Sequence, residues 1–281
     1  MKIGYRRFAG KAFVVGDKVT SKRGAWLEKR TALFKTLEER GNEVTIIKNG
    51  DEYTGYDIIL MEFGSNNYNF YKEDIDYSTE ILRTQKCIFI LDDPDLFPEV
   101  VKENGFKPIF WVNADPQICQ RYWCVVCEHF PVFGLQEMRE PTPEHNGKIV
   151  YYGGSSGGRE KKLLQYKTLI GTLEVVGQKK DFVSIKPKEP PIQEHRRNFY
   201  QQYMASLVLR DALHKKLGWN TGRKFHSILA GCPALDEDEN LLMFAEQMHD
   251  KDFRHNFIKQ QQESLRGAKK QCEDILEKYG M

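Results

Sequence analysis

The stretch that decides the fold is Val150–Leu164, "VYYGGSSGGREKKLL". Three apolar residues lead into Gly153–Gly158, which holds four glycines and two serines, and a charged, helix-favouring run begins at Arg159. Strand, glycine-rich turn and helix in this order are typical of the units that build parallel sheets. The turn is either a flexible connection or a place where an anion approaches the backbone closely.

The anion hypothesis for this loop rests on its donors. Glycines such as Gly154 remove side chains that would hold a ligand away from the backbone, and the following helix presents free N–H groups and the positive end of its dipole. Ser155 and Ser156 add hydroxyl donors, and Arg159 adds a charge-assisted fork. The spacing matches neither a Walker A loop nor G-x-G-x-x-G. We therefore expect a diphosphate site here, with a plain flexible turn as the alternative.

Length and composition limit the class of protein. A chain of 281 residues fits a pair of α/β domains, and 40% hydrophobic and 12% aromatic residues exclude disordered and fibrous classes. No segment approaches the roughly 18 consecutive apolar residues of a membrane span, so we expect no membrane association. Met1–Gly4 begins a strand rather than a signal peptide. Six cysteines without such a signal favour free thiols and a cytoplasmic location.

A metal site is a weak hypothesis. Cys119, Cys124 and Cys127 invite a zinc interpretation, but no second close pair completes four ligands. Cysteine is often simply a small buried hydrophobe, and we expect no metal here.

Short apolar runs alternate with amphipathic segments in the first half of the chain. The expected strands are Val44–Ile47, Asp57–Met61, Cys87–Leu91, Pro108–Val112 and Trp123–Cys127. The expected helices are about 25–40, 72–84 and 115–121. This alternation predicts a parallel sheet with helices on both faces.

The same alternation restarts after a linker-like piece, "MREPTPEHNG" (138–147), which has two prolines and no periodicity. The expected strands are 148–152, 172–176, 205–209 and 233–235, and the expected helices are 158–170, one after about 196, 222–230, 239–249 and 259–278. We expect two Rossmann-like domains, 1–146 and 147–258, with the helix at about 259–281 packing back on the first. Their strand ends should face a central cleft.

A second loop, "WNTGRKFHSILAGCPAL", supports the diphosphate hypothesis. Thr221 is a good helix cap, and Arg223 and His226 are three residues apart on one helix face. Arginine suits a phosphate, and histidine can hold a ribose hydroxyl or a base edge. The alternative is an exposed arginine beside a half-buried histidine.

A third loop, "FILDDPDLFPE", follows the Cys87–Leu91 strand and crowds carboxylates at its end. A carboxylate such as Asp93 in an apolar cleft could gain proton affinity and act as a general base. Glu128, after another predicted strand, could face the same space. Aspartate at a strand end also caps helices, which is the alternative for the loop.

A basic segment covers residues 5–30. It contains Arg6, Arg7, Lys11, Lys18, Lys22, Arg23, Lys29 and Arg30 against only Asp17 and Glu28. It could contact a phosphate backbone or be an ordinary solvated surface.

These loops, in this order, resemble the DNA β-glucosyltransferase family of T-even bacteriophages, enzymes of the GT-B fold. The resemblance covers, with gaps, about residues 43–135 and 148–237. It rests on "YDIILMEFGSNNYNF", "IFILDDPDLFP", "CEHFPVF", "YYGGSSGGREKK" and "TGRKFHSILAGCPAL". Two departures stand out: an arginine that the family has inside the glycine-rich loop has no counterpart, and the family's ribose-binding glutamate is His226 here.

The resemblance implies a role for each matched position. Asp93 matches the general base. Gly154, Ser155 and Arg159 match diphosphate contacts, Arg223 matches a second phosphate-binding arginine, and Ile192 falls near the uracil contact. The implied reaction is direct displacement, without a covalent intermediate, of a sugar from UDP-sugar onto 5-hydroxymethylcytosine in duplex DNA. The target base would flip out of the duplex, and the basic segment 5–30 would hold phosphates.

Other implications stay open. The sugar is glucose or a pentose such as arabinose, and a divalent cation could assist without being required. The resemblance implies a monomer working in the cytoplasm of an infected bacterium. The rival hypotheses are a GT-B glycosyltransferase with a non-DNA acceptor and a non-catalytic nucleotide- or DNA-binding protein.

Overall fold

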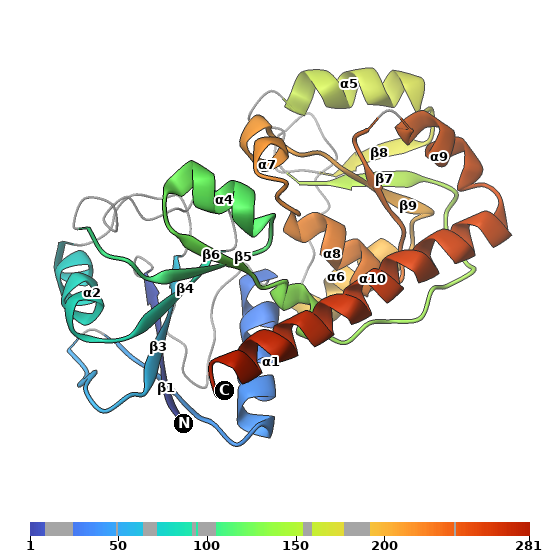
Figure 1. The fold of residues 1–281 in the computed structure, drawn as a ribbon. Helices are drawn as coiled ribbons and strands as arrows, with labels where there is room; N and C mark the ends of the chain where they lie inside the picture. The colour runs from blue at the N-terminus through green and yellow to red at the C-terminus, as the bar shows by residue number, and fades with distance from the viewer. Residues whose placement is uncertain are drawn as a thin grey trace. The chain divides into compact units, whose positions relative to one another are not determined.

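The computed structural model describes residues 1–8, 25–48, 50–63, 72–91, 94, 105–153, 159–176, 192–238 and 240–281. The chain forms two compact units, each with one parallel sheet and flanking helices (Figure 1). Unit 1 comprises Met1–Leu135, Lys216–Trp219 and Ala268–Met281, and unit 2 comprises Gln136–Lys215 and Asn220–Gly267. The predicted α/β class with two parallel sheets is confirmed. The central cleft expected for a GT-B protein stays a prediction.

Unit 1 contains six parallel strands in the order β2-β1-β3-β4-β5-β6. They are β1 (Lys2–Phe8), β2 (Glu43–Ile46), β3 (Ile58–Phe63), β4 (Cys87–Leu91), β5 (Ile109–Val112) and β6 (Val126–His129). Every residue of β4 is buried, as expected for a strand that has neighbours on both sides and helices on both faces. The chain direction across the sheet reverses between β1 and β3, which makes their carboxyl ends a topological switch point.

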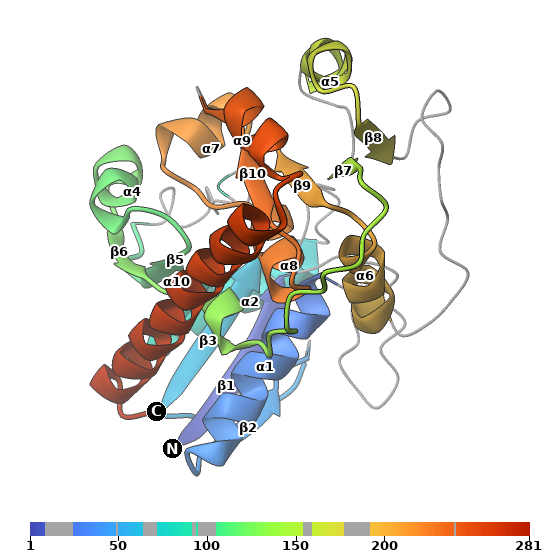
Figure 2. The same cartoon turned by 90° about the vertical axis from the view of Figure 1, so that its right-hand side faces the viewer.

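The helices of unit 1 cover both faces of this sheet. Helix α1 (Ala25–Glu39) and helix α2 (Lys72–Thr84) lie on opposite sides of it (Figure 1 and Figure 2). Right-handed crossovers require this, because the two helices lead to strands on opposite sides of the switch point. A short 3-10 helix, η2 (Val132–Leu135), precedes the second unit.

Helix α4 (Pro116–Trp123) corrects one predicted strand, Trp123–Cys127. Asp115 caps the helix by accepting hydrogen bonds from the backbone N–H groups of Gln117 and Ile118, and proline occupies the first turn. The helix therefore runs through Trp123. Cys124 ends it in the left-handed conformation with φ 58°, and β6 starts only at Val126.

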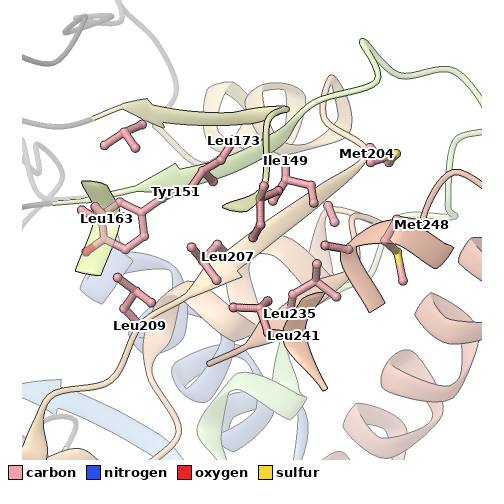
Figure 3. Close-up of a cluster of buried hydrophobic side chains, with 14 residues drawn as sticks. Ile149, Tyr151, Leu163, Leu173, Met204, Leu207, Leu209, Leu235, Leu241 and Met248 are labelled. Carbon is pink, nitrogen blue, oxygen red and sulfur yellow. The ribbon is translucent and has the colours of Figure 1, made fainter. Parts of the chain in front are cut away.

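Unit 2 contains four parallel strands in the order β10-β9-β7-β8. They are β7 (Ile149–Tyr152), β8 (Leu173–Val176), β9 (Ala205–Val208) and β10 (Ala234–Asp236). Alternate residues of β7 enter different cores: Ile149 and Tyr151 belong to the cluster in Figure 3, and Val150 packs in a second cluster with Tyr200. The order reverses between β7 and β9, which places a second switch point at their carboxyl ends.

The helices of unit 2 follow its strands. They are α5 (Arg159–Leu169), α6 (Ile192–Gln201), α7 (Ala212–Lys216), α8 (Gly222–Leu229), α9 (Leu241–Gln247) and α10 (Lys251–Lys278), whose residues from Ala268 on belong to unit 1. Helix α10 begins earlier than the predicted residue 259. Asp250 accepts hydrogen bonds from the backbone N–H groups of Asp252 and Phe253, and so caps the helix there.

The segment predicted as a linker, 138–147, is held firmly within unit 2. Arg139 donates to Asn198 at 2.6 Å and to Gln201 at 2.9 Å. Arg254 donates to the carbonyl oxygen of Thr142 at 2.8 Å. The prolines make this segment extended, and these hydrogen bonds fix it along the helices. The boundary between the units accordingly lies at 135/136, where the sequence predicted 146/147.

Candidate functional site

The carboxyl edge of the unit-2 sheet is the place where its parallel fold would put a ligand. Strands β7 and β9 pair over Ile149–Ala205 and Val150–Ser206 only, although each strand continues for two more residues. The ladder between them therefore stops before their carboxyl ends. The loop after β7, the turn after β9 and the start of α8 all emerge at this edge.

Arg223, in the first turn of α8, lies against the end of β7. A Cβ atom placed on Gly153 would be 2.7 Å from its Nε and 2.9 Å from its Cζ. Its guanidinium is also 5.2 Å from the ring centroid of Tyr151. Only glycine at 153, with φ +152°, permits this approach of the side chain to the backbone. The guanidinium is thereby fixed at the entrance of the glycine-rich loop.

Arg159, the first residue of α5, is fixed from the neighbouring turn. Its Nη2 is 3.3 Å from Oδ2 of Asp211, which follows β9, and both side chains are about one-fifth exposed. Asp211 also accepts from the backbone N–H of His214 at 2.9 Å and contacts its Nδ1 at 2.6 Å. Burial raises the pKa of Asp211, but the hydrogen bonds from His214 and the charge of Arg159 outweigh burial and lower it. Asp211 is therefore an ionised support for Arg159 at neutral pH.

More charges surround this pair. Glu237, just after β10, contacts Lys162 at 2.5 Å and Lys215 at 3.1 Å, and Asp236 contacts Lys224 at 2.5 Å. Burial raises the pKa of Glu237, but the two lysines hold it below its usual range. These ion pairs connect α5, α7 and α8 to the end of β10.

Four buried polar atoms of this edge take part in neither a hydrogen bond nor an ion pair among the residues that the structure describes. They are Nε of Arg159, Nε of Arg210, Oγ1 of Thr221 and Oδ1 of Asp236. Thr221 takes the N-cap position of α8, as predicted, but its hydroxyl makes no capping bond. Buried polar atoms without partners cost about 1–3 kcal/mol each, so their gathering at one edge is typical of a site that a ligand completes. Three of the four can donate, which suits an anion.

The predicted site residues divide into two groups. Arg159 and Arg223 both lie at this edge, next to the ends of β9 and β7. Asp93, Gly154, Ser155 and Ser156 lie outside the described residues, as does the side chain of Ile192 at the start of α6. His226 is 7% exposed, within the buried part of α8, and its predicted contact with a ribose stays a prediction.

Glu128, predicted as a second catalytic carboxylate, is engaged by neighbours within unit 1. It accepts from Nε1 of Trp111 at 3.2 Å and from the hydroxyl of Tyr279 at 2.9 Å, and it pairs with Lys278. Both of its oxygens thus fix the end of the chain to β5 and β6. Burial, with the hydrogen bond to Glu128, raises the pKa of Tyr279, which therefore remains a hydrogen-bond donor. These contacts favour a structural role for Glu128, and its predicted catalytic role stays a prediction.

The basic segment also requires a correction. Arg6 is 3% exposed and donates to Oγ of Ser78 at 2.8 Å, so it is not an exposed contact for DNA phosphates. Arg30 is equally buried, and its Nη2 lies 2.9 Å from Oε2 of Glu62. Lys29, also buried, lies with its Nζ 4.5 Å from the ring centroid of Phe133. Lys11, Lys18, Lys22 and Arg23, and the side chain of Arg7, are outside the described residues.

The thiols give no sign of a metal centre. Cys119 and Cys127 are buried, and burial raises the pKa of each to about 12. Within the described part of the chain no group of three or more His, Cys, Asp or Glu side chains could hold a metal ion. Among the same described residues, no helix is long and apolar enough to cross a membrane.

Sequence reasoning missed the residues that support the arginines. Asp211, His214 and Arg210 occur in "LVLRDALHKK", where a buried strand is followed directly by charged residues. Charged residues directly after a buried strand are also what indicates the loop after β4 as a candidate site. The sequence does not indicate the turn after β9 as clearly, because α7 has only five residues and shows no periodicity.

Comparisons with known proteins leave the family open. No family model matches the chain, and no curated protein matches it. Among solved structures, an α1,3-fucosyltransferase is similar over 92% of this chain and 80% of its own, with a TM-score of 0.49 and 9% identity. A periplasmic solute-binding protein of an ABC transporter from Actinobacillus succinogenes 130z, with bound D-allose, covers 97% and 92%, with a TM-score of 0.31 and 11% identity. At these scores the function must be argued from the site itself.

Proposed function

We propose that the chain is a glycosyltransferase that takes its sugar from a nucleoside diphosphate sugar, with UDP as the nucleotide. The observation that carries this proposal is the gathering of Arg159 and Arg223 at the switch point of unit 2, each fixed by its own neighbour. Two guanidinium groups and the N-termini of α5 and α8 match the charge of a diphosphate. The resemblance of the surrounding loops to DNA β-glucosyltransferases supports UDP as the nucleotide.

The chemistry follows from where charge develops. In direct displacement the acceptor hydroxyl oxygen bonds to the anomeric carbon, the bond from that carbon to the β-phosphate oxygen breaks, and its electron pair leaves with UDP. The hydroxyl proton passes to a general base, for which we propose Asp93 after β4. The leaving diphosphate gains one negative charge. Arginines fixed before the reaction stabilise this growing charge without reorganising.

For the acceptor we propose 5-hydroxymethylcytosine flipped out of duplex DNA. The support is the resemblance, above all the match of "IFILDDPDLFP" to the strand that carries the family's base. One observation favours a second candidate, a glycosyltransferase with a non-DNA acceptor. Three cations of the basic segment, Arg6, Lys29 and Arg30, are buried within unit 1 and so offer nothing to a phosphate backbone.

A donor screen tests the proposal. The full chain would be incubated with UDP-glucose, UDP-arabinose and other UDP-sugars and a hydroxymethylcytosine duplex, and the nucleosides analysed by mass spectrometry. We expect one sugar to be added, with no product on an unmodified duplex and none from Asp93→Asn. Arg266→Met, which changes an exposed arginine of α10, should remain active.

Two results would count against the proposal in different ways. Hydrolysis of a UDP-sugar without any DNA product would reject the DNA acceptor and leave the second candidate. No turnover of any UDP-sugar, with or without DNA, would reject the glycosyltransferase and favour a binding protein.

A further inference from the structure

The turn that follows β9 holds a cation with no assigned role. Leu209 belongs to the same buried cluster as Tyr151 at the end of β7 and Leu163 in α5, and the three side chains lie near one another in Figure 3. Arg210 follows directly, so its backbone is placed beside the end of β7 and the start of α5. The next residue, Asp211, reaches Arg159 itself.

Arg210 is incompletely satisfied in this position. Its Nε is buried without a hydrogen-bond partner, and among the described residues its guanidinium makes neither a hydrogen bond nor an ion pair. A guanidinium carries five N–H donors and keeps its charge at every accessible pH. Leaving such a group partly desolvated without an acceptor costs free energy, which selection tolerates when a ligand supplies the acceptor.

The carboxylates nearby are already engaged. Asp211 is shared between Arg159 and His214, and Glu237 is shared between Lys162 and Lys215. Asp236 is paired with Lys224. Each of these three carboxylates is paired with another cation and none is paired with Arg210, so the charge of Arg210 at this edge remains for a ligand. The glycine-rich loop 153–158 contains no cation of its own.

We infer that Arg210 is a third guanidinium of the diphosphate site and binds the leaving group together with Arg159. This inference rests on the proposed function, and it adds a substrate-binding residue that neither the spacing nor the resemblance indicated. The turn after β9 thereby supplies the positive charge that the loop after β7 lacks. As UDP departs with one more negative charge, this guanidinium contributes to transition-state stabilisation as well as to binding.

The test compares Arg210→Met with Arg266→Met, a matched change on an exposed arginine of the same unit. Calorimetric titration would measure the affinity of each for UDP and for inorganic pyrophosphate, and a thermal melt would give Tm without ligand. We expect Arg210→Met to weaken both ligands tenfold or more, and its Tm to equal or exceed that of the wild type. Arg266→Met should bind as the wild type does.

The outcomes separate the inference from the proposed function. Unchanged affinity for both ligands in Arg210→Met, with the wild type binding UDP, would overturn the inference alone. A lowered Tm with unchanged affinity would likewise overturn it by showing a structural role. If the wild type binds pyrophosphate through Arg210 but no UDP, the inference stands and the nucleotide of the proposed function fails.

Discussion

Replacing Gly153 by alanine should displace the guanidinium of Arg223 without removing its charge, and so tests the position of this group alone. The new Cβ would meet Nε of Arg223 at 2.7 Å where ordinary contact begins at 3.4 Å, so the guanidinium must retreat by about 0.7 Å. A displacement of this size should break a charge-assisted hydrogen bond to the ligand. The loss of about 1.5–3 kcal/mol of binding free energy would weaken the affinity for UDP about 10–100-fold. Alanine at φ +152° adds strain of about 1–3 kcal/mol, which should lower Tm by about 2–12 °C.

Calorimetry with UDP and thermal melts would measure both effects, and a double-mutant cycle sharpens the test. Combining Gly153→Ala with Arg223→Ala removes the clashing group, so the two stability losses should add up to more than the loss in the double variant. Gly267→Ala, where nothing lies within 4 Å in α10, is the control and should stabilise the protein by about 0.5–1 kcal/mol. Stability losses that are strictly additive in the double variant, or an affinity for UDP that Gly153→Ala leaves unchanged, would refute the proposed position of Arg223.

Three further changes test charged side chains of the two units, Glu128 and Glu62 in unit 1 and Glu237 in unit 2. Glu128→Gln should lower the free energy of unfolding in urea by about 1–3 kcal/mol and leave UDP binding unchanged; lost turnover at full stability would instead indicate a catalytic carboxylate. Glu62→Gln should cost about 3–5 kcal/mol because it removes the carboxylate charge that lies 2.9 Å from the buried guanidinium of Arg30, and a smaller loss for Glu62→Leu combined with Arg30→Met would confirm that cause. The pKa of Glu237 is lowered in the folded state, so its contribution to stability is complete above its usual value of 4.5 and is lost as the pH falls through the folded-state pKa. Melts between pH 6 and about pH 3 should therefore show a steeper loss of Tm for the wild type than for Glu237→Gln, and parallel curves would exclude this contribution.

Much of the fold could be predicted from the sequence where burial is continuous. The run "CIFIL" predicts β4 with its bounds, because a central parallel strand is apolar on both faces. The bounds of α2 also match, since its apolar residues recur at helical spacing. The apolar neighbours of Trp123 predict a strand there, whereas the helix that Asp115 caps runs through Trp123 in the structure.

The candidate site could be predicted in part. Arg159 and Arg223 could be found because glycine, a cap and an arginine occur together after a strand or before a helix. The burial of Arg6 could not be predicted, because the sequence of a strand does not show whether a serine or water accepts the hydrogen bonds of its arginine. Asp211 and Arg210 depend on β9 lying beside β7, a long-range pairing that no local pattern reveals.

The most direct test of the central claim is a titration of UDP into the wild type, Arg159→Ala and Arg223→Ala at constant salt. We expect UDP to bind the wild type and each substitution to weaken the affinity for UDP about tenfold or more, with uridine binding poorly to all three proteins. Equal UDP affinity in all three proteins, or no affinity in the wild type, would contradict the claim that these arginines hold a diphosphate.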